Sequence, residues 1–420
     1  MTAILFCAFL GLLALGVPIA FSVAIAATIV LIVGDIPLIL IAQRMFAATD
    51  SFPLVAVPYF ILAGDLLARG TISKKLVSFA EALMGQLQGA LSAVSVVAGM
   101  FFAAISGSGA ATTAAVGATL IPELKERHYR EDSAAALVAA AGCIGVVIPP
   151  SVPMVLYAVI ADQSVTRLFK NGFVPGFMMG GVLIVIALKQ AYDRNYPKGA
   201  PFSFKNVVAT FVPAIWGIMM PLIILGGIFS GMFTPSEAAA VAVIYAALVS
   251  FFIYRDLTVK ELGRIILGSA RTSAIIMIII ACSGIFGWVL ANWKIPETVA
   301  QMVLSFSDNQ YVVLFLMAII ILIAGVFMET SSAVILLTPV FLPLVKVLGV
   351  DLIHFGILFT VGIAIGMITP PVAINLFVAS SITGMKIERI AKAVVPYLLG
   401  LIAMFFIYIF LPLFFPNLIF

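Results

Sequence analysis

Charge is scarce in this chain. Lysine, arginine, aspartate and glutamate make up 10% of its 420 residues, while 64% of the residues are hydrophobic. A soluble domain carries about 25% charged residues. This composition excludes an ordinary soluble protein and predicts an all-α polytopic membrane protein, because helices satisfy their own backbone groups in lipid. We expect membrane lipid around it and no nucleic-acid partner.

Cysteine and histidine are also scarce. Cys7, Cys143 and Cys282 lie in apolar runs without the paired spacing of a disulfide or metal set. The two histidines, His128 and His354, lie in or beside connecting segments. An intramembrane enzyme needs a nucleophile with a base, or a metal cluster. The sequence offers neither at membrane depth, so no enzyme is expected.

Long apolar runs are abundant. A bilayer core of roughly 30 Å needs about 20 residues of helix. We expect single crossings at 2–33, 52–69, 133–162, 173–192, 208–231, 236–254, 272–291, 352–384 and 393–415. Two further regions, 85–125 and 310–348, are interrupted near the middle by Ser106–Gly109 and Glu329–Ser332. We interpret both as re-entrant hairpins that return to the side they entered from.

The basic residues test this arrangement. With two hairpins, 17 of the 22 lysines and arginines fall on one side of the membrane. By the positive-inside rule that side is the cytoplasm. The sequence therefore predicts a cytoplasmic N-terminus and a periplasmic C-terminus.

A pattern of helix breakers occurs twice. Residues 145–150 read Gly-Val-Val-Ile-Pro-Pro and residues 366–371 read Gly-Met-Ile-Thr-Pro-Pro, an offset of 366 − 145 = 221. Proline interrupts a helix because it lacks an N–H and clashes with the preceding turn. Paired interruptions of this kind are typical of the binding sites of secondary transporters built from inverted repeats. We predict a first repeat over 1–205, a linking helix over 206–235 and a second, inverted repeat over 236–420.

Two segments between crossings are candidates for a role outside the spanning helices. Residues 34–51 are amphipathic, and their counterpart near 255–271 carries four basic residues. Both are candidates for arms along the membrane interface that brace a fixed scaffold. Solvated connectors are an equally good interpretation.

The breaks predict two sodium sites. Free carbonyls before each diproline, together with hydroxyls of a hairpin tip, form a set of hard oxygen ligands with few carboxylates, which suits Na⁺ better than a proton relay. The proposed ligands of the first site are Ser106, Gly145, Ile148 and Pro149. Those of the second site are Gly325, Gly366, Thr369 and Pro370.

An anionic substrate is expected between the two sites. The half-helix after each diproline presents free N–H groups and a positive dipole end. The expected substrate contacts are Ser108, Pro150, Ser332, Pro371 and Asn375. The alternative is that these small polar clusters are close helix-packing surfaces.

Three carboxylates stand out. Glu329 lies at a hairpin tip, where it can bind Na⁺, carry a proton or cap the following helix. Glu237 completes a capping box with Thr234. Asp65 ends a crossing and is expected at the interface.

Four segments together resemble the large membrane subunit of TRAP transporters (tripartite ATP-independent periplasmic transporters, DctM-like). They are residues 102–112 (FAAISGSGAAT), 145–151, 234–239 (TPSEAA) and 366–372. The resemblance implies an ion-transporter-type fold with two re-entrant hairpins, two broken helices and an elevator mechanism. It also implies Na⁺-driven uptake across a bacterial inner membrane, and the family's ion ligands fall on the eight positions named above.

The resemblance further implies two partners, a small four-helix membrane subunit and a periplasmic substrate-binding protein. Family substrates are organic acids, including C4-dicarboxylates and sialic acids, and the chain looks closer to the sialic-acid branch. Its hairpin tips lack the Ser-Asn-Thr tripeptide of related dicarboxylate transporters, so substrate contacts are not carried over from those. The alternative function is a stand-alone Na⁺/dicarboxylate symporter without partner subunits.

Overall fold

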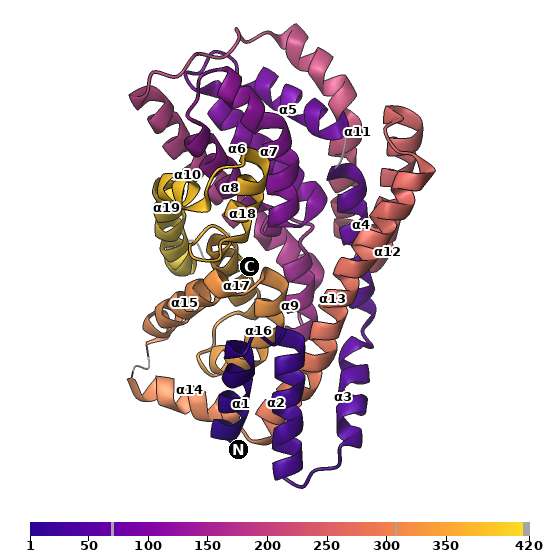
Figure 1. Cartoon of the computed structure of the whole chain (residues 1–420), viewed down its shortest axis with the longest axis vertical. Coiled ribbons are helices and arrows are strands. Elements are labelled where there is room, and N and C mark those ends of the chain that lie inside the picture. The colour runs from indigo at the N-terminus through magenta and orange to yellow at the C-terminus, as the bar shows by residue number, and fades with distance from the viewer. Residues whose placement is uncertain (69–70, 307–308, 415–420) are drawn as a thin grey trace.

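Two bundles of helices stand side by side in the computed structural model, which describes residues 1–68, 71–306 and 309–414 (Figure 1). Two short 3₁₀ helices, η1 (Phe52–Val55) and η2 (Cys143–Val146), and one π-helix, η3 (Val249–Tyr254), lie next to the ends of α-helices. The first bundle consists of α1 (Thr2–Ala14), α2 (Ile19–Val33), α3 (Ile39–Thr49), α4 (Ala56–Ala68), α11 (Phe204–Phe229), α12 (Pro235–Leu248) and α13 (Val259–Asn292).

The second bundle holds both hairpins and both broken helices. Its members are α6 (Ala90–Ser106), α7 (Gly109–Glu126), α8 (Glu131–Gly142), α9 (Val152–Ala161), α10 (Val165–Asp193), α15 (Gln310–Phe327), α16 (Thr330–Val347), α17 (Leu352–Gly366), α18 (Ile374–Thr383) and α19 (Ile387–Phe414). Two helices, α5 (Thr71–Met84) and α14 (Ile295–Phe306), lead from the first bundle into the hairpins.

The predicted breaks are present in the second bundle. Hairpin α6–α7 turns at Gly107-Ser108, and hairpin α15–α16 turns at Met328-Glu329. Both diprolines lie outside helix, between α8 and α9 and between α17 and α18, and both Pro-Pro bonds are cis. Helix α8 from Asp132 and helix α17 from Ile353 are buried on all sides, so they form the centre of the bundle.

The helix bounds recur at the spacing seen in the sequence. Adding 221 to the bounds of α7 (109–126) gives 330–347, which are the bounds of α16. The same offset carries α5, α6, α8, α9 and α10 onto α14, α15, α17, α18 and α19 to within a few residues. In Figure 1 the first hairpin occupies the upper half of the molecule and the second hairpin the lower half.

The prediction of one crossing over residues 2–33 is wrong. The chain turns between Ala14 and Ile19, where Gly16 has a φ of 80° and Pro18 precedes α2. Helices α1 and α2 then pack against each other, and the N-terminus lies at the end of the molecule where α3 begins (Figure 1). The argument for a cytoplasmic N-terminus depended on a single crossing, so it no longer holds.

The two segments considered as interfacial arms are helical, and their position along the membrane interface stays a prediction. Residues 259–271 belong to the 34-residue helix α13, which starts at the capping box of Thr258 and Glu261. Helix α3 is bent by 67° from the η1–α4 segment that follows it, and α3 packs along α13. No proline lies between Thr258 and Asn292, and single glycines are tolerated inside a helix, so α13 runs on as one helix.

Seven helices in the described residues are long and apolar enough to cross a membrane, or eight if the bent pair counts as one span. Capping boxes at Thr234-Glu237 and Thr258-Glu261 fix the starts of α12 and α13, and the first of these confirms the role predicted for Glu237. The predicted orientation of the C-terminus rests on residues 415–420, which lie outside the described part of the chain.

Candidate functional site

The two hairpin tips meet at one cavity of about 220 Å³. The first tip contributes residues 106–111 and the second contributes Glu329, Thr330 and Ser331. Helix α4 closes one side with Ile61, Gly64 and Asp65. The remaining lining residues come from both breaks and from α13: Val146, Val152, Pro153, Thr272, Ile276, Met367 and Ile374.

The first tip assembles several oxygens beside the first break. Ser106 Oγ lies 2.8 Å from Thr112 Oγ1 and donates to the Ser108 carbonyl at 3.2 Å. Gly145 faces the same point, because a methyl group on it would lie 2.5 Å from Thr112 Oγ1 and 2.6 Å from the Ser108 carbonyl oxygen. Only a glycine lets the backbone of the break come this close to the tip.

The first tip also rests on the first diproline. Gly107 has a φ of 60°, and a methyl group on it would lie 2.7 Å from the carbonyl oxygen of Pro150. Ile148 packs against Gly176 of α10, and Pro149 is buried beside it. The first tip and the first break therefore form one closed unit.

The second hairpin contacts its break through Gly325 of α15 and not through the turn at Met328-Glu329. Gly325, one turn before the tip, and Gly366 at the end of α17 touch backbone to backbone, with no room for a methyl group on either. Thr369 Oγ1 donates to the Ile365 carbonyl at 2.9 Å. Pro370 and Pro371 are exposed. The proposed ligands of the second site are thus near one another, but the tip does not cover them.

Of the five expected substrate contacts, Ser108 lines the cavity. Ser332 is buried at the start of α16, Pro150 lies under the first tip, and Pro371 faces outward. Asn375 points away from the cavity: its Nδ2 donates to the Ala139 carbonyl at 3.1 Å and so joins α18 to α8. These four residues do not touch the cavity between the tips in this conformation.

Asp65 occupies a more central place than the sequence indicated. Its carboxylate accepts a hydrogen bond from Ser269 Oγ at 2.6 Å, and the residue lines the cavity between the tips. Asp65 thus lies beside the first tip, and its position relative to the membrane interface stays a prediction. The glycine before Asp65 was the available sequence signal for this position. A methyl group on Gly64 would lie 3.0 Å from the Cα of Ser106, so α4 comes close to the first tip here.

Glu329 acts as a helix cap in the structure. Its carboxylate accepts from the backbone N–H groups of Ser331 at 2.8 Å and Ser332 at 3.1 Å. Ser108 caps α7 at the equivalent position, since 108 + 221 = 329. The two tips therefore carry a neutral cap and an anionic cap at the same place.

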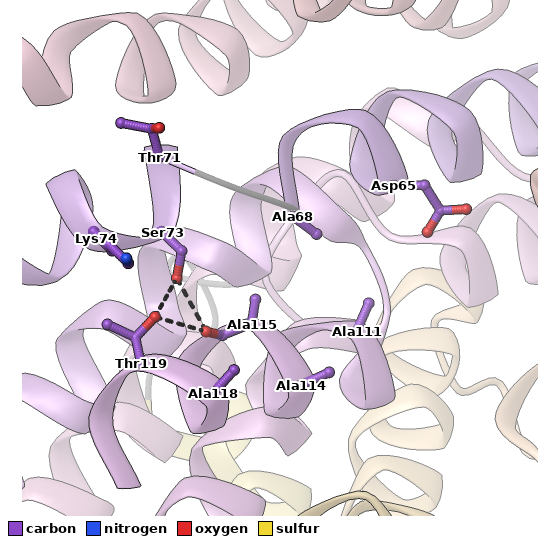
Figure 2. Close-up of a pocket in the computed structure, with 10 residues that line it drawn as sticks. All are labelled: Asp65, Ala68, Thr71, Ser73, Lys74, Ala111, Ala114, Ala115, Ala118 and Thr119. Atoms are coloured by element: carbon purple, nitrogen blue, oxygen red, sulfur yellow. Dashed lines mark hydrogen bonds between the residues drawn. The ribbon is translucent and has the colours of Figure 1, made fainter. Parts of the chain in front are cut away.

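A larger cavity of about 700 Å³ adjoins the first and shares Asp65 and Ala111 with it. Figure 2 shows its wall of alanines on α7, with Lys74 and the Ser73–Thr119 pair at the opposite side from Asp65. Ser73 Oγ donates to the Ala115 carbonyl at 3.0 Å and lies 3.0 Å from Thr119 Oγ1. The larger cavity therefore extends from the tips toward the start of α5, where Lys74 and Lys75 lie.

An all-helical chain whose hairpin tips and interrupted helices surround one cavity has the architecture of a secondary transporter. A family model for the tripartite ATP-independent periplasmic transporter, DctM component, matches residues 6–414. The chain belongs to this family of multi-pass membrane transporters.

Relatives of known name extend over nearly the whole chain. The chain is 39% identical to an isethionate TRAP transporter permease, DctMQ, of Oleidesulfovibrio alaskensis, over 97% of this chain and 65% of that protein. It therefore spans about two thirds of that relative's length. It is also 39% identical to the C4-dicarboxylate large permease of Pseudomonas aeruginosa, over 89% of this chain and 87% of the relative. The chain is 33% identical to the sialic acid large permease of Vibrio cholerae, over 93% of this chain and 92% of the relative.

Two solved transporters share the fold at low identity. The YdaH transporter of Alcanivorax borkumensis aligns with a TM-score of 0.63 and 15% identity, covering 90% of this chain and 88% of that one. MtrF of Neisseria gonorrhoeae aligns with a TM-score of 0.65 and 13% identity, covering 89% and 84%. The predicted all-α transporter fold is confirmed by this likeness.

Proposed function

We propose that this chain is the large membrane subunit of a Na⁺-coupled importer of a small organic anion. The observation that carries the proposal is the cavity at which both hairpin tips and both breaks meet. Free backbone groups at that depth need partners other than lipid. Sodium at the carbonyls and hydroxyls, and an anion at the N–H groups, would supply them.

The charges around the cavity favour coupling to a cation. Its described lining residues include the carboxylates Asp65 and Glu329 and no lysine or arginine. An anion about 4 Å from one carboxylate meets a repulsion of about 4 kcal/mol at an effective dielectric constant of 20. Bound sodium ions offset this repulsion, so anion binding and Na⁺ binding support each other.

The eight proposed sodium ligands and five substrate contacts keep these roles as proposals. Thr112 joins the first set, because its hydroxyl lies 2.8 Å from Ser106 Oγ. The residues that lie outside the cavity now, such as Pro371 and Ser332, are proposed to reach it when the second tip closes over the second break.

The substrate class is a small organic anion. The named relatives transport isethionate, C4-dicarboxylates or sialic acid. Isethionate is a sulfonate and the others are carboxylates, so a negative charge on two or three oxygens is their shared feature. Identities of 33–39% to relatives with such different substrates do not single out sialic acid.

The two bundles suggest an elevator mechanism with inverted repeats. The second bundle carries the tips and breaks, while α4 and α13 of the first bundle line the cavity from outside. A methyl group on Gly64 of α4 would lie 3.0 Å from the Cα of Ser106, so the bundles meet there through a smooth backbone surface. We propose that the second bundle moves as a unit along the first.

The proposed setting is a bacterial inner membrane, with the lysine- and arginine-rich loops in the cytoplasm. The larger cavity reaches Lys74, which supports the proposal that it opens toward the cytoplasm and that this conformation faces inward. We propose a small four-helix membrane subunit and a periplasmic binding protein as partners, the latter delivering the substrate from outside.

Uptake into proteoliposomes tests this function. The chain is reconstituted with and without a small subunit and a binding protein of its own transporter family, and labelled isethionate, succinate and sialic acid are offered under Na⁺ or K⁺ gradients. We expect uptake of one anion that requires both partners and Na⁺. Na⁺-dependent uptake by this chain alone would instead establish the stand-alone symporter, and uptake independent of Na⁺ would remove the sodium sites.

A further inference from the structure

A separate cavity of about 270 Å³ lies at the basic end of the second bundle. Three segments distant in sequence form it: the start of α8, the end of α10 and the start of α19. Its lining residues are Arg130, Asp132, Ser133, Gln190, Arg194, Arg389, Lys392, Ala393 and Pro396. Four cationic side chains and one carboxylate therefore converge on one cavity.

A buried carboxylate holds two of the arginines in place. Asp132 is 5% exposed and accepts hydrogen bonds from Arg130 Nε at 3.2 Å and Nη2 at 2.7 Å. Arg389 Nε lies 3.6 Å from the same carboxylate. The side chains of Arg130 and Arg389 remain about 60% exposed (60% and 62%), so each guanidinium is anchored on one edge and open on the other.

A third arginine, Arg194, is held by Ser133, the residue that follows Asp132. Arg194 Nη1 donates to Ser133 Oγ at 2.7 Å, and Ser133 Oγ donates in turn to Gln190 Oε1 at 3.2 Å. Asp132 balances one of the four positive charges that line the cavity. A guanidinium held along one edge suits bidentate recognition of a phosphate oxygen pair.

The cluster is only partly repeated at the other end of the molecule. Helix α10 carries Arg167 and Lys170 at the third and sixth residues from its start, as α19 carries Arg389 and Lys392. Asp351 stands at the position related by 221 residues to Arg130, so the equivalent of this arginine is an acid.

An apolar surface continues directly from the cavity. On α19, Lys392, Val395 and Leu399 follow one another on one helix face, and Val395 and Leu399 are 44% and 61% exposed. Helices α10 and α19 lie together at the outer edge of the bundle (Figure 1). A basic cavity above an exposed apolar stripe matches a phosphate group that carries acyl chains.

We propose that this cavity binds the phosphate of an anionic phospholipid from the cytoplasmic leaflet, with the acyl chains along the apolar stripe of α19. The leaflet follows from the proposed orientation of the chain, but binding itself does not depend on Na⁺ coupling. Because α8, α10 and α19 belong to the proposed moving bundle, the lipid would hold that bundle at the height of the inner headgroups.

Native mass spectrometry of the purified chain tests the proposal. The chain is exposed to an equimolar mixture of phosphatidylglycerol and phosphatidylcholine of identical acyl chains. We expect preferential retention of phosphatidylglycerol, and at least a tenfold loss of that preference in the double variant Arg389→Gln/Lys392→Gln, because about 1 kcal/mol is expected per basic residue. Both side chains are solvent-exposed, and an unchanged melting temperature would show that the variant folds.

The matched control is Lys189→Gln, which removes a basic residue of α10 near the same end but outside the cavity. It should keep the preference for phosphatidylglycerol. Equal retention of both lipids by the unaltered chain, or an unchanged preference in the double variant, would overturn the proposal. Displacement of the lipid by millimolar inorganic phosphate would instead assign the cavity to a soluble phosphate compound and overturn the lipid assignment. None of these results depends on transport, so they separate this proposal from the proposed function.

Discussion

Around the first break every residue from Cys143 to Ser151 is buried, whereas around the second break Thr369 is half-buried and residues 370–372 are exposed. The hairpins differ in the same sense. Helices α6 and α7 pack along each other, while α15 and α16 touch little and α15 packs on α17 instead. The same breaker pattern thus occurs once covered by its tip and once uncovered.

This difference indicates that the two proposed sodium sites are at different stages of assembly. Ser106 Oγ already lies 2.8 Å from Thr112 Oγ1 and 3.2 Å from the Ser108 carbonyl oxygen. At the second site, the hydroxyl of Thr369 is bonded to the Ile365 carbonyl at the end of α17, and the diproline is exposed. We expect the first site to be preformed and the second to form when its tip closes.

Thiol labelling should give the largest contrast. Ser151 and Val372 are equivalent, since 151 + 221 = 372, but Ser151 is buried and Val372 is exposed. In a Cys7→Ser background, which removes the exposed native cysteine, a maleimide should label Val372→Cys readily and Ser151→Cys hardly at all. Comparable labelling of the two positions would contradict the difference between the breaks.

Crowding the first site should strongly reduce transport. Gly145→Ala places a methyl group 2.5 Å from Thr112 Oγ1 and 2.6 Å from a backbone oxygen, which costs about 1–3 kcal/mol or separates tip and break. We expect Na⁺-dependent uptake to fall by up to about 100-fold. Gly181→Ala is the control, because no atom lies within 4 Å of its added methyl group. Normal uptake by Gly145→Ala would show that the tip and the break need not touch.

Removing one hydroxyl from each site should raise the Na⁺ requirement by different amounts at the two sites. Ser106→Ala deletes an oxygen of the assembled set and should raise the Na⁺ concentration for half-maximal uptake about tenfold, if one lost oxygen ligand costs about as much as one hydrogen bond to a charged group. Thr369→Ala should raise the same Na⁺ concentration about threefold. The effect is smaller because the Thr369 hydroxyl must give up its hydrogen bond to the Ile365 carbonyl before it can bind Na⁺.

The control for this pair is Thr360→Ala, which removes a similar hydroxyl bonded to the Gly356 carbonyl within α17, away from the break. Its Na⁺ requirement should not change. A larger effect of Thr369→Ala than of Ser106→Ala would reverse the proposed order of assembly.

Replacing the anionic cap of the second tip should have the smallest effect on the Na⁺ requirement. Glu329→Ser gives the second tip the neutral cap that Ser108 provides to the first, and serine still caps a helix well. We expect correct folding and about a threefold higher Na⁺ requirement from the lost negative charge near the site. Glu237→Ser, at a cap outside the cavity, should leave the Na⁺ requirement unchanged in the same uptake measurement.

Local chemistry explains which features the sequence predicted. The breaks depend on glycine and proline, the tips on the short polar runs Ser106–Gly109 and Glu329–Ser332, and the cap at Glu237 on a four-residue pattern, so each could be located without knowing the packing. The split between α1 and α2 had a similar signal at Gly16 and Pro18, but the unbroken apolar composition of residues 2–33 outweighed it.

Packing between distant segments explains what the sequence missed. The direction of Asn375 depends on the Ala139 carbonyl of α8, 236 residues away, and the position of Asp65 depends on Ser269 of α13. The exposure of Pro370 and Pro371 depends on where the second tip stands. These are tertiary contacts that no local pattern records.

The most direct test of the paired sodium sites is the melting temperature of the purified chain in NaCl and in choline chloride at equal ionic strength. A ligand that binds the folded state at 100 times its dissociation constant adds about 2.7 kcal/mol of stability. We predict that Na⁺ raises the melting temperature of the unaltered chain and of Thr360→Ala, and that the rise is smaller in both Ser106→Ala and Thr369→Ala. An equal rise in all four proteins, or no rise in any, would contradict sodium binding at the two breaks.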